Sequence, residues 1–117
     1  MQNIDASALA AAKAKLDAAE ARREEVLLRH IANGVDIRSR NVEIGSEVVI
    51  APGAVILAGT ILRGKTTIGA GCVIGPNTLI EDSTVDEDTI VNASQVYSSH
   101  LGPHNNIGPF THVRINT

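Results

Sequence analysis

Three histidines lie close together in the last fifth of the chain, at positions 100, 104 and 112. An imidazole acts as a general base in acyl transfer when a substrate hydroxyl or amine is held beside it. Three imidazoles at this spacing could also bind a metal ion, although no carboxylate adjoins His100, His104 or His112 in the sequence. Both chemistries are hypotheses, and the favoured interpretation makes all three histidines polar surface residues.

Five acidic residues form a second group of candidate ligands, at positions 81, 82, 86, 87 and 88. Carboxylate oxygens suit a hard cation such as calcium. Acidic residues are also common in turns, and the favoured interpretation places these five at corners facing water. The single cysteine, Cys72, excludes an internal disulfide and a cysteine-based zinc site, and we expect its side chain in the core.

The composition limits the class of protein. The 117 residues are 44% apolar but only 2% aromatic, with a net charge of −3. This acidic balance argues against a nucleic-acid partner. No signal peptide is recognisable, and no apolar stretch approaches the roughly 20 residues that span a membrane. We therefore expect a cytoplasmic protein with no membrane partner and a core of small aliphatic residues.

The first third of the chain, before the candidate histidines and acidic residues, has the sequence of a helix. Residues 6–32 contain strong helix formers and no proline or glycine, Asp5 or Ser7 could cap the start, and Asn33-Gly34 is a stop signal. Leucine and isoleucine form a narrow stripe at Leu9, Leu16, Leu27 and Ile31. The favoured interpretation is a solvated helical arm over residues 1–33, and the alternative is that the stripe pairs with a partner.

Beyond residue 34, large aliphatic residues recur every six positions. The series runs Ile44, Ile50, Ile56, Leu62, Ile68, Ile74 and Ile80, shortens to steps of five at Val85, Val96 and Leu101, and ends at Ile107 and Val113. Small or β-branched residues precede most of these by two positions. Glycines and one asparagine follow several of them by three, where a left-handed corner is expected.

A repeat of six residues is typical of a parallel β-helix, in which three sides make one coil. We therefore predict a mainly β fold over residues 34–117, a parallel β-helix of hexapeptide repeats with about four coils, after one N-terminal α-helix. The resemblance to known hexapeptide β-helices implies that the coils are left-handed. The aliphatic ladders leave no room for aromatic rings, which explains their scarcity.

The residues just before each aliphatic position should point outward. On one face these are Val55, Val73 and Ile90, on a second Ile61 and Leu79, and on the third mainly Thr67, Thr84 and His100. Two faces thus carry apolar residues where water is expected, which indicates buried contacts. We expect self-association of prisms side by side, as a homotrimer.

Several sequence segments resemble those of one enzyme family. They are residues 66–78, 81–85, 33–35 and 107–110, together with the preceding helix and the five-residue steps. The chain is similar to the linker helix and first C-terminal coils of the bacterial bifunctional N-acetylglucosamine-1-phosphate uridyltransferase/glucosamine-1-phosphate acetyltransferase. The resemblance implies a left-handed β-helix, and it matches Arg114 to a family arginine that binds substrate. Where the family continues with proline and glycine, this chain has Ile115 and Asn116.

The resemblance also implies what this chain would do. The family's nucleotide-binding domain precedes the helix, and its catalytic histidine and acetyl-coenzyme A contacts lie in later coils, past Thr117. We therefore expect a non-catalytic oligomerisation scaffold or relic without a cofactor, whose partner could be a uridyltransferase or a longer β-helix. The alternative is a small transferase with a site between subunits, which would use acetyl-coenzyme A, Arg114 and one of the three histidines.

Overall fold

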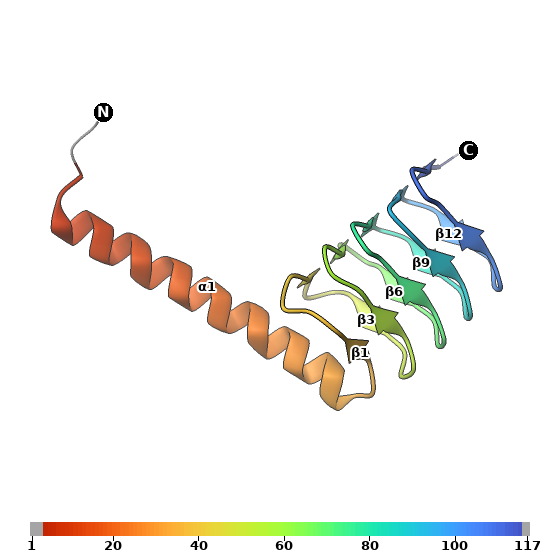
Figure 1. The fold of residues 1–117 in the computed structure, drawn as a ribbon, viewed down its shortest axis with the longest axis horizontal. Helices are drawn as coiled ribbons and strands as arrows, with labels where there is room; N and C mark the ends of the chain where they lie inside the picture. Colours follow the sequence, from red (N-terminus) through yellow and green to blue (C-terminus); the bar gives the residue numbers. More distant parts are fainter. Residues whose placement is uncertain (1–3, 116–117) are drawn as a thin grey trace.

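Residues 4–115 are described by the structure, a computed structural model in which one long helix precedes a stack of short parallel strands (Figure 1). The helix α1 spans Ala6–Ala32. Fourteen strands follow it within the described residues, and each pairs in parallel with a strand three places along the chain. The stack is a β-helix, as the six-residue period predicts, and it is left-handed, as the resemblance to known hexapeptide β-helices implies.

The strands form three sheets, which are the three faces of the solenoid. Sheet A contains β1 (Asp36–Ile37), β4 (Val55–Ile56), β7 (Val73–Ile74), β10 (Ile90–Val91) and β13 (Asn106–Ile107). Sheet B contains β2 (Glu43–Ile44), β5 (Ile61–Arg63), β8 (Leu79–Glu81), β11 (Gln95–Tyr97) and β14 (His112–Val113). Sheet C contains β3 (Val49–Ile50), β6 (Thr67–Ile68), β9 (Thr84–Val85) and β12 (His100–Leu101).

The length of a coil changes along the stack. Val55 pairs with Val73, 18 residues later, whereas Val73 pairs with Ile90 after 17 and Ile90 with Asn106 after 16. These shortened coils contain the five-residue steps that the sequence analysis identified. The solenoid has about five coils, one more than expected, because β1 begins it before the six-residue series starts at Ile44.

The core is a set of aliphatic ladders, as predicted. The large aliphatic residues from Ile44 to Leu101 are buried, and Ile107 and Val113 in the last coil are partly buried. The small or β-branched residues two positions earlier are also buried: Val42, Val48, Ala54, Thr60, Thr66, Cys72 and Thr78. Burying each Val, Leu or Ile side chain contributes about 1.5–3 kcal/mol, so the repeat itself supplies the driving force for folding.

Buried threonines in the small-residue ladder need hydrogen-bond partners, since an unsatisfied buried hydroxyl is costly. The hydroxyl of Thr60 donates to the carbonyl of Leu57 at 2.7 Å, and that of Thr66 donates to the carbonyl of Arg63 at 2.8 Å. No buried side-chain polar atom among the described residues lacks a partner. The hydroxyls therefore bind the backbone at the corners and do not weaken the core.

Helix α1 has the ends that its sequence predicts. Asp5 caps the start, and its carboxylate accepts a hydrogen bond from the Ala8 amide at 2.7 Å. Gly34, with a φ of 97°, lies just after the end. Only the last turns touch the solenoid, where Leu27 is buried against the first coil, whereas Leu16 is 61% exposed on the projecting part (Figure 1). Within the described residues no helix is long and apolar enough to cross a membrane.

The corners of the coils use left-handed backbone. Gly53, Gly59, Gly71 and Asn77 have φ values of 90°, 79°, 74° and 51°, which confirms the conformation expected from their positions. In later coils other residue types adopt this conformation at corners, including Ala93, Ser98 and Phe110. A side chain with a Cβ adopts a positive φ at some energetic cost, so these corners are the strained points of the fold.

Candidate functional site

His100 lies on sheet C, in β12, and is exposed. Its Nε2 atom is 2.8 Å from Oδ2 of Asp86, which follows β9 in the neighbouring coil. No carboxylate adjoins the histidines in the sequence, but the fold places the carboxylate of Asp86 beside His100, although the two residues are 14 positions apart. The carboxylate of Asp86 can hold the exposed His100 ring in one orientation.

The other two histidines lie elsewhere on the solenoid. His104 occupies a left-handed corner with a φ of 58°, and its Nδ1 is 3.7 Å from Oδ2 of Asp88. His112 lies on sheet B, with its ring edge-on to Tyr97 at a centroid distance of 5.3 Å. The three histidines do not converge. Among residues 4–115, no group of three or more His, Cys, Asp and Glu side chains could hold a metal ion.

Four of the five acidic residues at positions 81, 82, 86, 87 and 88 make side-chain contacts within the chain, whereas Glu87 is exposed. Glu81 lies in β8 and pairs with Arg63 of β5, with 2.6 Å between its Oε1 and the Arg63 Nε. The carboxylate of Asp82 accepts a hydrogen bond from the Lys65 amide at 2.9 Å, across one coil. These carboxylates thus tie neighbouring coils together and do not gather around a shared point.

Cys72 is fully buried in the small-residue ladder of the core. Its Sγ lies 3.0 Å from the Asp86 carbonyl oxygen, to which the thiol donates. Burial is the main cause that raises the pKa of the thiol, so it is protonated and unreactive at neutral pH. This placement is the one expected from its position in the six-residue series.

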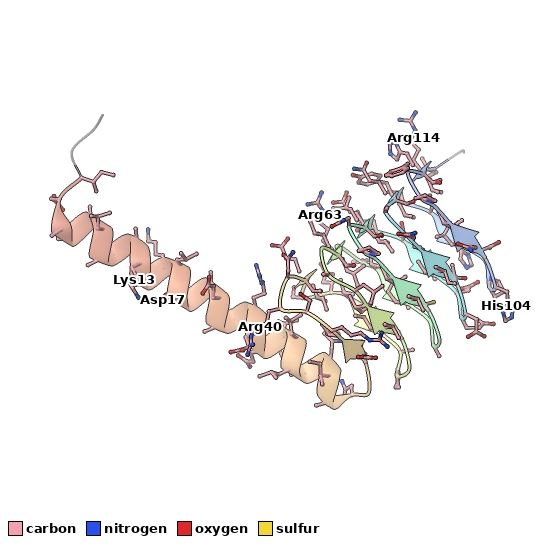
Figure 2. All side chains as sticks on the ribbon, viewed as in Figure 1. Lys13, Asp17, Arg40, Arg63, His104 and Arg114 are labelled. Carbon is pink, nitrogen blue, oxygen red and sulfur yellow. The ribbon has the colours of Figure 1, made fainter. Side chains whose placement is uncertain are left out.

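Tyr97, His112 and Arg114 carry three different polar groups near the last two strands of sheet B. Gln95 pairs with His112 in the ladder between β11 and β14, so continuing the register by two residues places Arg114 beside Tyr97. Arg114 is exposed, and it projects from the same side of the solenoid as Arg63, whereas His104 lies on the opposite side (Figure 2). A guanidinium, a phenol and an imidazole on one surface could bind an anion.

Sequence reasoning identified His112 and Arg114 but missed Tyr97 as their neighbour. The sequence contained only an indirect sign that Tyr97 is a neighbour. Tyr97 and Arg114 are 17 residues apart, which is the length of one coil with a single five-residue step.

A groove between α1 and the first coil was also missed. It has a volume of about 480 Å³ and is lined by Asp17, Glu20, Ala21, Arg23, Glu24, Leu27 and Arg40. Arg40 bridges the two elements, with its Nη2 2.8 Å from Oε1 of Glu24, and Arg23 donates to the Arg40 carbonyl. Arg23, Glu24 and Arg40 thus join the helix to the first coil beside the buried Leu27.

The outward rows of sheets A and B carry the predicted apolar residues. Val55, Val73, Ile61 and Leu79 are half-buried, and Ile90 is 40% exposed. On sheet C, Thr67, Thr84 and His100 are exposed, as expected. Sheet C also presents Val49, which the sequence analysis did not single out and which is 61% exposed in the first coil.

A scan against protein-family models and a search of curated proteins each find no match for this chain.

Proposed function

We propose that this chain is a β-helical oligomerisation scaffold that forms a homotrimer through sheets A and B. The observation that carries the proposal is the pair of apolar rows on these two adjacent faces, Val55, Val73 and Ile90 on sheet A and Ile61 and Leu79 on sheet B. Contiguous apolar side chains on a folded surface mark sites of association.

The two rows occupy matching heights on the solenoid. In the second coil Val55 is followed by Ile61, and in the third Val73 is followed by Leu79. A ring of copies around an axis parallel to the solenoid brings each coil next to the same coil of its neighbour, because rotation causes no shift along the axis. Sheet A of one copy would then meet sheet B of the next with apolar residues opposite apolar residues.

The ends of both rows are polar. Asp36 and Glu43 lie in the first coil, and Asn106 and His112 lie in the last. An interface with an apolar centre and a polar rim is the usual anatomy of a specific contact. Sheet C lacks this pattern in its central coils, where Thr67 and Thr84 face outward.

We further propose that the chain is related to the uridyltransferase/acetyltransferase family and acts in the cytoplasm without catalysis of its own. Two observations support this relation: the sequence segments that resemble the family, and the order of a long helix followed by a left-handed β-helix. In that role the scaffold would assemble with a uridyltransferase or with a longer β-helix, and it would need no cofactor.

The proposal is tested by the mass of the protein in solution. Light scattering at micromolar concentration is expected to give three times the mass of one chain. Val73→Glu, in the centre of the sheet A row, should lower that mass, whereas the matched control Thr67→Glu on sheet C should not. A wild-type mass equal to one chain contradicts the proposal.

A transferase with its site between subunits is the second candidate function. Tyr97, His112 and Arg114 favour it, since they place an anion-binding group beside a histidine on a proposed contact face. Acetyl transfer from acetyl-coenzyme A to glucosamine-1-phosphate, and uridylyl transfer, are the assays. Turnover that is lost in Arg114→Ala or in a histidine variant would establish an enzyme, and the absence of turnover in wild-type protein would reject it.

A further inference from the structure

We propose that the edge between sheets A and B faces the three-fold axis of the assembly, and that Phe110 anchors it by contacting Phe110 of the other two copies. This edge, called here the A/B edge, consists of the corners at residues 57–60, 75–78, 92–94 and 108–111. The inference rests on the proposed trimer and adds which edge is central and which residue holds it.

Phe110 is unusual in both exposure and backbone. It is the only phenylalanine of the chain, it is 91% exposed, and its φ is 62°. The equivalent corners in earlier coils are formed by Gly59, Asn77 and Ala93, which are small or tolerate this conformation well. A bulky ring in strained backbone and in water has no role within this chain, so a contact outside it is the simplest explanation.

The distribution of charge distinguishes the A/B edge from the other two edges. Residues near a symmetry axis meet their own copies, so a charged side chain there faces the same charge. The edge between sheets A and C carries Asp86, Glu87 and Asp88 at consecutive positions, and the edge between sheets B and C carries Glu47, Lys65 and Asp82. Three copies joined at either of these edges would place like charges together.

The A/B edge carries no charged residue in any of its corners from residue 57 to residue 111. In the first coil, before this stretch, the two arginines near the edge are already paired. Arg38 contacts Asp36 at 3.0 Å, and Arg40 contacts Glu24 at 2.8 Å. From the second coil onward, this edge can therefore approach its own copies without bringing like charges together, which the other two edges cannot.

The shape of the solenoid concentrates the contact at this edge. Each copy in a ring touches a neighbour on either side, and sheets A and B, which carry the apolar rows, share the A/B edge. Each corner of a three-sided prism has an angle of about 60°. Three such corners around an axis occupy about 180° of the full 360°. Neighbouring faces are therefore closest beside the edge, so sheets A and B meet across the part of each face nearest the axis and separate farther out.

Small residues form most of that edge, which lets three backbones come close. Phe110 is the one large apolar side chain exposed there, in the last described coil. Three rings that meet at the axis would exclude water from one another, as aromatic anchors do at the centre of interfaces.

The proposal predicts opposite effects of one substitution on folding and on assembly. Phe110→Gly relieves the left-handed backbone, so the thermal stability of the dissociated chain should be unchanged or raised. The same variant should weaken the trimer roughly tenfold or more, measured as its dissociation constant by analytical ultracentrifugation. Ala93→Gly is the matched control, because it relieves the same corner one coil earlier, at a φ of 46°, and removes no ring.

Cross-linking tests the position of the axis independently. Phe110→Cys in a Cys72→Thr background should give covalent dimers on oxidation with diamide, because only residues near an axis can meet their own copies. Ser98→Cys, at a corner between sheets B and C in the same background, should remain uncross-linked. Dimers from Ser98→Cys but not from Phe110→Cys would overturn the assignment.

The outcomes separate this inference from the proposed function. Wild-type protein with the mass of one chain would refute the trimer itself. If the wild-type protein is a trimer and the Phe110→Gly and Ala93→Gly variants have the same trimer dissociation constant, only the role of Phe110 and the A/B edge is refuted.

Discussion

The Nε2 atom of His100 lies 2.8 Å from Oδ2 of Asp86, so a hydrogen bond joins two consecutive coils on the outside of the solenoid. Both side chains contact solvent, and exposed pairs of this kind contribute between 0 and about 1 kcal/mol. We predict that His100→Ala lowers the free energy of unfolding by no more than about 1 kcal/mol. Urea denaturation is the measurement, with Thr84→Ala on the same sheet as the control. A loss of several kcal/mol would show that the pair has a larger structural role.

The centre of the core is expected to be far more sensitive. Ile68 is fully buried in the aliphatic ladder, whereas the adjacent Thr67 faces solvent. Ile68→Ala should lower the free energy of unfolding by about 2–5 kcal/mol, because it leaves a cavity between coils that cannot close. Thr67→Ala should change it by about 0.5 kcal/mol or less. Similar losses in the two variants would contradict the alternation of inward and outward residues.

Two leucines of α1 should behave differently in the same experiment. Leu27 packs against the first coil at 5% exposure, and Leu16 lies on the projecting part. Leu27→Ala should lower the free energy of unfolding by about 2–3 kcal/mol, since it removes a buried contact. Leu16→Ala should have little effect on the isolated chain, because alanine is the better helix former. If Leu16→Ala proves as destabilising as Leu27→Ala, the projecting part of the helix has a partner.

The attachment of α1 should weaken in mild acid through His30. Burial, and then the positive charge of Arg29, lower the pKa of the His30 imidazole below 6.5. The unfolded chain therefore takes up the proton first as the pH falls. This contribution to stability is complete above about pH 6.5 and declines as the pH falls toward the lower pKa of the folded state.

His30→Gln removes the titrating group and should flatten this part of the profile. The measurement is the difference in unfolding free energy between pH 7 and pH 5.5 for wild type and variant, and His104→Gln, at an exposed corner, is the control. An equal decline in wild type and His30→Gln would assign the pH dependence to other groups.

The inward side chains were predictable because the repeat carries the signal many times. Ile56, Leu62 and Ile68 occupy equivalent places, so a single misplaced residue could not hide the pattern, and all three are fully buried. The helix was predictable for a local reason, since Asp5 and Gly34 are recognisable end signals.

Contacts between coils were harder to predict than the coils themselves. The pairing of Asp86 with His100 depends on the summed length of three sides, including two five-residue steps. The first strand escaped detection because Ile37 lies seven residues before Ile44, outside the six-residue series. The exposed Phe110 could be read from the sequence only as part of a corner, and its backbone strain required the structure.

The variation in coil length has a consequence for how such a chain can change during evolution. Each missing residue in the shorter coils falls at a corner, and the residues beyond it, such as Val85 and Val96, still face inward. Deletion of one codon at a corner therefore leaves the downstream pattern of burial intact, whereas a deletion inside a strand would turn every later side chain of that strand to the opposite face. The gene can lose single codons at the corners and still encode the same fold.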